Sequence, residues 1–432
     1  MSIDDKTTRA QAAKTGRPPG ETMGLDRLRA LLTEVLPGNR FYRSKLVLTG
    51  TVPEFVSWED YYSRMPFTTK QELVEDQTAF PPYGSNLTFD LVNYTRYSQT
   101  SATSGRPMVW LDTADSWNWM LGNWQHVYAA AGVDRRDRIF FAFSFGPFLG
   151  FWTAFEAAAQ LDALCIPGGG MSSAARLRAM LIHKVSILCC TPTYALRLGE
   201  VAREEGIDLK DSRLRRIIVA GEPGGSVGSV RDTVAAAWPK ARMFDHYGMT
   251  EIGPVAYEAP ETAGCLRIIE NSYHAEIINP ESGDRVGDGE IGELVLTTLG
   301  RGACPLLRYR TGDLVRGVRD TASGERLLEG GILGRADDMV LVRGVNIYPR
   351  AVDEVVRSIP EITEYQVKVG RKSAMTEVSI AIETSHHNTA AMTAQRLEGA
   401  LRSVFSLRIP VMVAESGSLP RFEMKARRWI RE

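Results

Sequence analysis

Cysteine is scarce in this chain, and no two cysteines have the spacing of a metal-binding or redox pair. The five cysteines are Cys165, Cys189, Cys190, Cys265 and Cys304. Because the count is odd and CxxC is absent, the sequence argues against both a disulfide framework and a zinc site. We expect reduced thiols packed in a core, as in proteins of a reducing compartment, and no zinc.

The sequence also lacks a long apolar run and an excess of charge of either sign. No run reaches the about 18–20 residues that cross a bilayer, and the polar start MSIDDKTTRAQAAKTGRPPG has no apolar segment of a secretory signal. Lys and Arg number 51 against 52 Asp and Glu, whereas a nucleic-acid-binding protein usually has a basic excess. We therefore expect a cytoplasmic protein that binds neither membranes nor nucleic acid.

The length and composition that remain are those of a globular protein with more than one domain. The chain has 432 residues, of which 44% are hydrophobic and 24% charged. That length exceeds one ordinary core and predicts two or three domains. Between about 116 and 245, short apolar runs such as RIFFAFS (138–144) alternate with helical patterns such as AARLRAMLIH. This alternation predicts an α/β fold with a parallel sheet covered by helices.

Four glycine- or proline-containing segments follow the predicted strands of this sheet. They are FSFGPF (143–148), CCTP (189–192), AGEPGG (220–225) and DHYGMTE (245–251). Because ligands bind parallel sheets at the carboxyl ends of the strands, we expect these segments to form a pocket. The alternative is that they are four ordinary turns.

The pattern of predicted secondary structure changes twice in the second half of the sequence. After residue 270, HAEIINPESGDRV and GEIGELVLTTL read as antiparallel strands joined by Gly/Asp turns. From about 338 the chain has predicted strands (DMVLVRGVNIY, TEVSIAIET) and helices (PRAVDEVVRSI, TAQRLEGALRSVF) of its own over nearly 100 residues, which suits a small separate domain. We expect a tail at 1–20, a large domain at 21–334 and a small domain at 335–432.

The segment TSATSGRP (100–107) has the composition of a phosphate-binding loop. It is not a Walker A motif, which requires GxxxxGK[ST]. Its hydroxyls and backbone N–H groups can nevertheless donate to phosphate oxygens, and Arg106 adds a positive charge. Taken alone, the segment is equally a surface turn.

Five further segments follow this loop in the order of a known family. They are AGEP (220–223), YGMTE (247–251), YRTGD (309–313), GRADDMVLVRGVNIYP (334–349) and LPRFEMKARR (419–428). Together they resemble the acyl-adenylate-forming superfamily of ligases, and in particular its phenylacetate–CoA ligase branch. The resemblance covers about residues 39 to 428 and includes NRFYRSKL (39–46) and MPFTTKQEL (65–73).

The resemblance implies a fold and a two-step reaction. The fold is a large adenylation domain with parallel and mixed sheets flanked by helices, followed by a mobile C-terminal α+β lid. A carboxylate attacks the α-phosphate of ATP to give an acyl-adenylate and pyrophosphate, and a thiol, usually coenzyme A, then displaces AMP. The carboxylate is repelled by the negative charges of ATP. Each pair of like unit charges about 4 Å apart costs roughly 4 kcal/mol at an effective dielectric of about 20. The site must therefore supply cations and fixed donors.

The resemblance assigns the chemical roles to three residues. Lys425 corresponds to the C-terminal lysine that bridges the carboxylate and the α-phosphate, although by composition it is a solvated tail lysine among arginines. Glu251 corresponds to the Mg²⁺ ligand, and Thr250 to a phosphate contact. One carboxylate with phosphate oxygens is a usual arrangement for Mg²⁺.

The same resemblance implies the nucleotide site and the hinge. Asp313 should accept hydrogen bonds from both ribose hydroxyls, or else be a turn residue, and Tyr247 offers a ring to the adenine. Asp337 matches the hinge about which the small domain turns before the GVNIYP loop lines the pantetheine tunnel. The implied nucleotide- and coenzyme-binding residues are Thr100, Ser101, Thr103, Ser104, Gly105, Arg106, Gly221, Glu222, Pro223, Asp245, Tyr247, Gly248, Met249, Asp313, Arg335 and Gly344.

The acid pocket is expected after the first strand of the sheet. Phe145 and Phe148 are the candidate walls, with Ala220 and His246 nearby, and aromatic walls favour a flat, phenylacetate- or benzoate-like acid. Core packing is the competing interpretation of each Phe, and a structural hydrogen bond that of His246.

Two residues depart from the family pattern and leave other functions open. Where relatives have SGTTGKP, this chain has Ala102 and Arg106, which change backbone freedom and the geometry of the cation. The acyl group could pass to a carrier-protein phosphopantetheine or an amine instead of coenzyme A. The chain could also bind a nucleotide or acyl-adenylate without turnover. Relatives are often dimers, so a homodimer is a further expectation.

Overall fold

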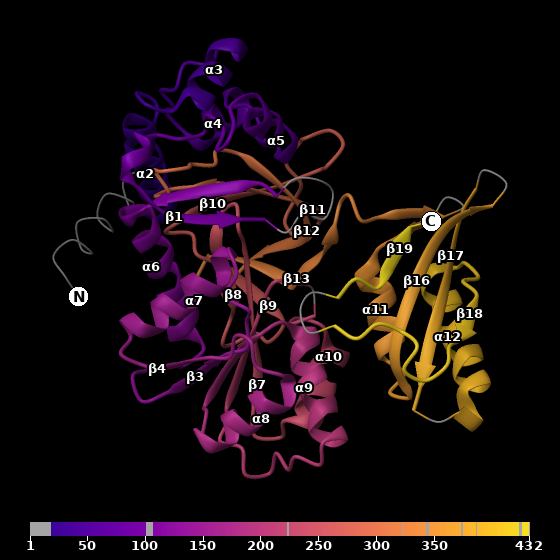
Figure 1. Cartoon of the computed structure of the whole chain (residues 1–432). Coiled ribbons are helices and arrows are strands. Elements are labelled where there is room, and N and C mark those ends of the chain that lie inside the picture. Colours follow the sequence, from indigo (N-terminus) through magenta and orange to yellow (C-terminus); the bar gives the residue numbers. More distant parts are fainter. Residues whose placement is uncertain are drawn as a thin grey trace.

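The chain folds into a large N-terminal domain and a smaller C-terminal domain, which lie side by side in the computed structural model (Figure 1). The structure describes residues 19–100, 107–222, 224–321, 323–342, 345–372, 375–385, 387–422 and 426–431. The large domain has a mixed sheet flanked by helices, and the small domain is α+β. This architecture confirms the predicted fold class.

Four helices at the start of the described chain cover one end of the large domain. They are α2 (Pro19–Val35), α3 (Arg40–Thr49), α4 (Trp58–Arg64) and α5 (Lys70–Ala79). Side-chain caps set the beginnings of three of them, and at α5 the Thr69 hydroxyl and the Glu72 carboxylate form a reciprocal capping box. Helix α2 begins at Pro19, two residues inside the segment expected to be a tail.

A short hairpin brackets the TSATSGRP loop. After a 3₁₀ turn, η1 (Leu91–Asn93), strand β1 (Tyr94–Gln99) pairs antiparallel with β2 (Val109–Thr113). At the base of the loop, Thr100 N donates to the Met108 carbonyl over 2.9 Å, and Met108 N donates to the Thr100 hydroxyl over 3.0 Å. The hairpin therefore holds the two ends of the loop together.

The parallel part of the main sheet follows the predicted alternation. Its strands, in the spatial order β4–β3–β5–β6–β7, are β3 (Arg138–Phe141), β4 (Leu164–Pro167), β5 (Ile187–Cys190), β6 (Arg216–Val219) and β7 (Arg242–Met249). The helices are α6 (Ala114–Ala130), α7 (Leu149–Gln160), α8 (Ser173–Ile182), α9 (Pro192–Glu204) and α10 (Gly228–Ala237). The four predicted pocket segments thus follow or end neighbouring strands at one edge of the sheet.

Alternating side chains of the parallel strands face two separate hydrophobic clusters. On β3, Ile139 and Phe141 pack with α6 and α7, whereas Phe140 packs with α8 and α9 on the opposite face. Strands buried on both faces read as continuous apolar runs, as RIFF does.

The sheet continues beyond β7 with antiparallel pairing. The further strands are β8 (Gly253–Glu258), β9 (Cys265–Ile268), β10 (Tyr273–Ile278), β11 (Ile291–Thr298), β12 (Tyr309–Arg319) and β13 (Arg326–Arg335). The antiparallel strands expected after residue 270 are present, and they belong to the same 11-stranded sheet. Strand β13 ends at Arg335, next to the predicted domain boundary.

The C-terminal domain has a four-stranded sheet covered by two helices and a hydrophobic cluster of its own. Its elements are β14 (Val340–Val342), β15 (Val345–Ile347), α11 (Pro349–Arg357), β16 (Ile362–Lys372), β17 (Met375–Thr384), η2 (His387–Thr389), α12 (Ala390–Phe405), β18 (Val411–Val413) and β19 (Trp429–Arg431). The segment DMVLVRGVNIY, expected as one strand, contains the hairpin β14–β15 instead. Among the helices in the described ranges, none is both long and apolar enough to cross a bilayer.

Candidate active site

Asp313 of β12 joins β7 and β13 through a buried hydrogen-bonded group. The Tyr247 hydroxyl donates to Asp313 Oδ2 over 2.6 Å, and Arg335 Nη1 lies 3.2 Å from Oδ1. Burial raises the pKa of Asp313 to about 6, although the charge of Arg335 and the hydroxyl of Tyr247 oppose the rise. A buried, oriented carboxylate of this kind is suited to accept hydrogen bonds from the two hydroxyls of a ribose.

Arg335 connects this group to the predicted hinge. Its Nε lies 2.9 Å from Asp337 Oδ1, so one guanidinium contacts both carboxylates. Gly312 has φ +75°, and a Cβ there would lie 2.8 Å from Arg335 Nη2. Glycine at this position therefore allows Arg335 to approach β12.

Glu251, the predicted metal ligand, lies in the turn after β7 with a largely buried side chain. Its Oε1 is 3.4 Å from Nζ of Lys70, the first residue of α5. The carbonyl oxygens of Thr250 and Glu251 accept hydrogen bonds from Arg301 Nη1, which fixes the backbone of this turn. Gly248 and Met249 lie half-buried at the end of β7.

Glu222 of the AGEP segment uses both carboxylate oxygens to join distant parts of the chain. Oε1 accepts a hydrogen bond of 2.8 Å from Thr193 N at the start of α9, and Oε2 accepts one of 2.8 Å from Ala426 N. Ala426 directly follows Lys425 in the sequence. Ala426 therefore lies next to Glu222, which follows Ala220 and Gly221 after the end of β6.

Asp245 organises the loop after AGEP. It accepts hydrogen bonds from the Ser226 hydroxyl and from His246 N, the latter over 2.9 Å. Burial raises its pKa to about 6. A Cβ at Gly225 would lie 2.1 Å from Asp245 Oδ1, so only glycine fits there. Asp245 thus fixes the backbone of the loop that follows AGEP.

The FSFGPF segment forms an aromatic cluster after β3. Phe145, with φ +50°, has its ring centroid 5.2 Å from that of Trp152 and 5.4 Å from that of Phe155. Phe148 lies at the start of α7, with its centroid 5.6 Å from that of Phe151. Both predicted wall residues are half-buried, which leaves ring surface for a ligand as well as for packing.

His246 is buried and neutral at physiological pH. Its Nδ1 is 3.0 Å from the Ala256 carbonyl oxygen, and its ring centroid is 4.4 Å from that of Trp124. Burial lowers its pKa to about 4. The structural hydrogen bond foreseen as an alternative is therefore present.

Several predicted site residues lie outside the described residues. They are Ser101, Ala102, Thr103, Ser104, Gly105, Arg106, Pro223, Gly344 and Lys425. Their described neighbours Thr100, Met108, Glu222, Val345 and Ala426 fix where each segment leaves and re-enters the fold.

Comparison with known proteins places this site in a family. Residues 98–301 match the AMP-binding enzyme family, and residues 344–432 match the AMP-binding enzyme C-terminal domain. The phenylacetate–coenzyme A ligase of Escherichia coli (strain K12) is 31% identical, over 94% of this chain and 95% of the relative. The chain belongs to the phenylacetate–coenzyme A ligase family of AMP-binding enzymes. The Thermus thermophilus ligase of the same name is also 31% identical, over 85% of this chain and 84% of its own.

Solved structures of one ligase distinguish the arrangement of the two domains in this member of the family. The 2-hydroxyisobutyryl-CoA ligase in the postadenylation state, with 2-HIB-AMP, has a TM-score of 0.90 at 28% identity. The same ligase in the thioesterification state, with CoA, has a TM-score of 0.71. Both comparisons cover 95% of this chain and 89% of the other. The domain arrangement described here therefore resembles the postadenylation state of that ligase more than its thioesterification state.

Sequence reasoning missed three residues that this ligase-family site brings together. They are Lys70, Asp112 and Arg301; the last two lie outside the quoted motifs, and isolated charged residues are usually solvated. For Lys70 a signal existed, because MPFTTKQEL was one of the matched segments. For the other two, only the three-dimensional structure reveals the contact.

Proposed function

We propose that this protein activates an aromatic carboxylic acid, phenylacetate- or benzoate-like, with ATP. A carboxylate oxygen attacks the α-phosphorus, the bond to pyrophosphate breaks, and an acyl-adenylate forms. The thiol of coenzyme A then attacks the acyl carbon, AMP leaves, and a thioester results. Atoms and charge balance with one ATP consumed for each thioester.

The observation that carries this proposal is the placement of Asp313. The carboxylate is buried, held by Tyr247 and Arg335, and linked through Arg335 to the hinge residue Asp337. A ribose bound to this carboxylate would hold the nucleotide at a fixed point of the large domain. Positioning and fixed charge are what phosphoryl chemistry requires from a protein.

The aromatic cluster supports a flat acid as the substrate. Phe145 and Phe148 flank the turn between β3 and α7, and both keep part of their rings exposed. Offset or edge contacts between aromatic rings contribute about 0.5–1.5 kcal/mol beyond burial. Such walls favour an aromatic ring over a short acyl chain or one that has a second charged group.

The residues around Glu251 fit a magnesium ion bound together with ATP. Within the described ranges, no group of three or more His, Cys, Asp and Glu side chains is arranged to hold a metal by itself. One protein carboxylate completed by phosphate oxygens and water is a usual Mg²⁺ arrangement. Bound Mg²⁺ would neutralise developing phosphate charge, and Glu251 would hold it at the fixed turn after β7.

Lys425 is the proposed cation for the first step. Its neighbour Ala426 is hydrogen-bonded to Glu222 at the large domain, and this contact supports a role for the adjoining lysine in this domain arrangement. For the second step the small domain turns about Asp337, and Gly344 lines the path of the pantetheine arm.

The first test is acid-dependent exchange of pyrophosphate into ATP over a panel of aryl acids, with wild type and Lys425→Ala. Exchange that one aryl acid stimulates, and that the variant loses, supports adenylation and identifies the acid. No exchange with any acid, despite measurable ATP binding, would instead favour a nucleotide-binding protein without turnover.

The acceptor is tested next by adding free coenzyme A. Release of AMP and formation of a thioester support coenzyme A as the acceptor. Adenylation without thioester formation would point to a carrier-protein phosphopantetheine or an amine. A homodimer and a cytoplasmic location stay predictions, to be checked by sedimentation and by fractionation of the source cells.

A further inference from the structure

Glu222 of the large domain is hydrogen-bonded to Ala426, the residue directly after Lys425. Its Oε1 is held in the large domain by Thr193 N, and its Oε2 reaches across to Ala426 N in the small domain, each over 2.8 Å. Thr193 lies in the first turn of α9, where backbone N–H groups lack partners within the helix and favour a carboxylate. The large domain therefore orients Glu222 independently of the small domain.

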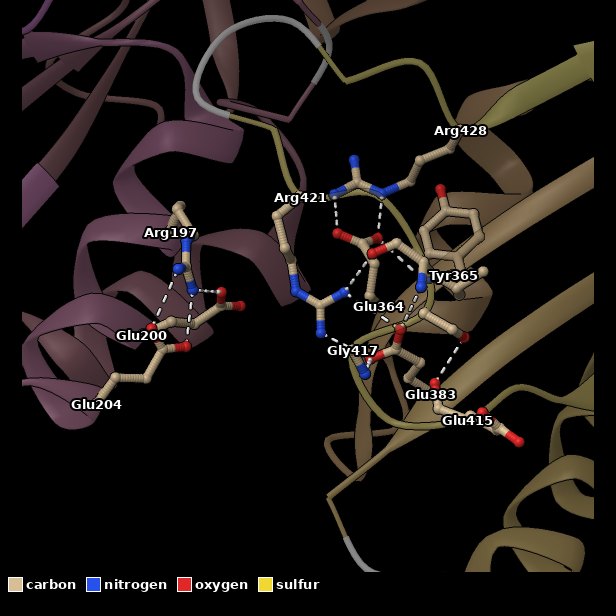
Figure 2. A network of polar contacts seen from close by, with 12 residues as sticks. Arg197, Glu200, Glu204, Glu364, Tyr365, Glu383, Glu415, Gly417, Arg421 and Arg428 are labelled. Atoms are coloured by element: carbon tan, nitrogen blue, oxygen red, sulfur yellow. Dashed lines mark hydrogen bonds and ion pairs between the residues drawn. The ribbon is translucent and has the colours of Figure 1, made fainter. Parts of the chain in front are cut away.

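The segment that Glu222 meets is itself tied firmly to the small domain (Figure 2). Before Lys425, Arg421 lies 2.7 Å from Glu383 of β17, whose carboxylate also accepts from Gly417 N and Leu419 N. The exposed fraction of the Glu383 side chain is only 1%. This clamp fixes the approach to the lysine.

A second clamp follows Lys425. Arg428 donates to both carboxylate oxygens of Glu364 on β16, over 2.6 and 3.1 Å, and its guanidinium lies over the ring of Tyr365. Figure 2 shows the two clamps on adjoining strands of the small sheet. Ala426, which lies between them in sequence and two residues before Arg428, must therefore follow the small domain as that domain moves.

The contact between Glu222 and Ala426 therefore belongs to one arrangement of the domains. The whole chain superposes on the postadenylation state of the hydroxyisobutyryl-CoA ligase with a TM-score of 0.90, and on its thioesterification state with only 0.71. When the small domain turns, the clamps carry Ala426 away, whereas the hydrogen bond from Thr193 to Glu222 stays within the large domain.

We propose that Glu222 is a positioning residue for adenylation: its carboxylate holds Ala426, the residue after Lys425, against the large domain, and releases it when the small domain turns. This proposal rests on the two-step function proposed above. It gives Glu222 a role different from the nucleotide contact that the family resemblance implied.

The test is Glu222→Gln, with the two half-reactions measured separately. A glutamine side chain has one acceptor oxygen, so it satisfies Thr193 N or Ala426 N but not both. We expect the maximal rate of pyrophosphate exchange to fall about tenfold, the loss that corresponds to one charge-assisted hydrogen bond. The KM for ATP and the rate of thioester formation from synthetic acyl-adenylate should change less than about twofold.

A second readout does not depend on catalysis. Hydrogen–deuterium exchange of the peptide that contains Ala426 should be faster in Glu222→Gln than in wild type, because this amide loses its acceptor. Glu205→Gln is the matched control. It makes the same change at the end of α9, in an exposed ion pair with Arg178, and should alter neither rate nor exchange.

The remaining outcomes overturn the proposal. A higher KM for ATP at an unchanged maximal rate would assign Glu222 to nucleotide binding. An equal loss in both half-reactions would indicate general damage to the fold. If wild type adenylates no acid, the proposed function fails independently of the role of Glu222. Amide exchange then tests that role by itself. Equal exchange in wild type and variant would refute the contact between Glu222 and Ala426 in solution.

Discussion

Arg301 and Asp112 form an ion pair that is shielded from solvent. The Nε and Nη2 atoms of Arg301 lie 2.8 and 2.6 Å from the two oxygens of Asp112, and the side chains are 0% and 1% exposed. Arg301 also donates to the carbonyl oxygens of Thr250 and Glu251, while Asp112 lies on β2, which leads out of the TSATSGRP loop. One guanidinium thus links the two segments expected to contact phosphate.

Removing this guanidinium should destabilise the large domain strongly. Arg301→Met leaves Asp112 buried without a partner, which typically costs about 3–5 kcal/mol of unfolding free energy. Urea unfolding measures the loss. The double variant Arg301→Met/Asp112→Asn should be less destabilised than the sum of the two single variants, because no unpaired charge remains. A loss below about 1 kcal/mol in the single variant would contradict this account of the pair.

Asp313 should make adenosine binding weaken in acid. Its pKa is raised to about 6, so below that pH it becomes protonated and loses acceptor capacity for the ribose hydroxyls. The dissociation constant of adenosine should rise by up to about tenfold for each pH unit below 6. Adenosine is chosen because its own groups do not titrate near pH 6, and isothermal titration calorimetry measures the binding.

Asp313→Asn is the control for this pH dependence. The variant should bind adenosine about 10- to 100-fold more weakly at pH 8 than wild type, through loss of hydrogen bonds to a charged acceptor. Its affinity should not change between pH 8 and 5. A wild-type slope that persists in the variant would assign the titration to another group, such as Asp245.

Lys70 should affect nucleotide use without affecting stability. Its side chain is 48% exposed and lies 3.4 Å from Glu251, and such partly exposed pairs contribute about 0–1 kcal/mol. When ATP is bound, the same ammonium group can pair with the phosphate oxygens and attract the nucleotide. Lys70→Ala should therefore raise the KM for MgATP about tenfold and leave the urea midpoint nearly unchanged. Lys210→Ala, at a position where the side chain is 88% exposed, is the control.

The parts of the fold that the sequence predicted are those in which local pattern and burial agree. The runs around Ile139, Ile187 and Ile217 are apolar because both faces of the parallel sheet are covered, and they were recognised. Strand β16 was not recognised, although Tyr365, Val367 and Val369 are buried and alternate with polar residues, which is the pattern of a strand on a sheet covered on one face.

The site was predictable where a motif fixed a residue and not where distance in sequence separated partners. Asp313 and Tyr247 lie within motifs, but their hydrogen bond joins positions 66 residues apart. Arg301 and Asp112 are 189 residues apart and outside the motifs. The role inferred for Glu222 depends on a contact across 204 residues between two domains. Such pairings follow from topology, which the local sequence pattern does not specify.

His246 should make the protein less stable in mild acid. In the folded state burial lowers its pKa from 6.5 to about 4, so between these pH values only the unfolded chain binds the proton. The unfolding free energy therefore falls as the pH falls from 6.5 to 4, by about 3 kcal/mol in total from this group. Urea unfolding at a series of pH values measures the slope.

The variant His246→Phe isolates this contribution. It keeps a ring against Trp124 but loses the hydrogen bond to Ala256, so at pH 8 it should be about 1 kcal/mol less stable than wild type. The difference between the two proteins should shrink as the pH falls and reverse sign before pH 4, where the variant should be about 2 kcal/mol more stable, because only wild type has the buried imidazole to protonate. Taking this difference also removes the opposing effect of Asp245, whose raised pKa is common to both proteins. A difference that stays constant from pH 8 to 4, or a wild-type imidazole proton resonance that titrates near pH 6.5, would show that His246 is solvated and free to act as a base.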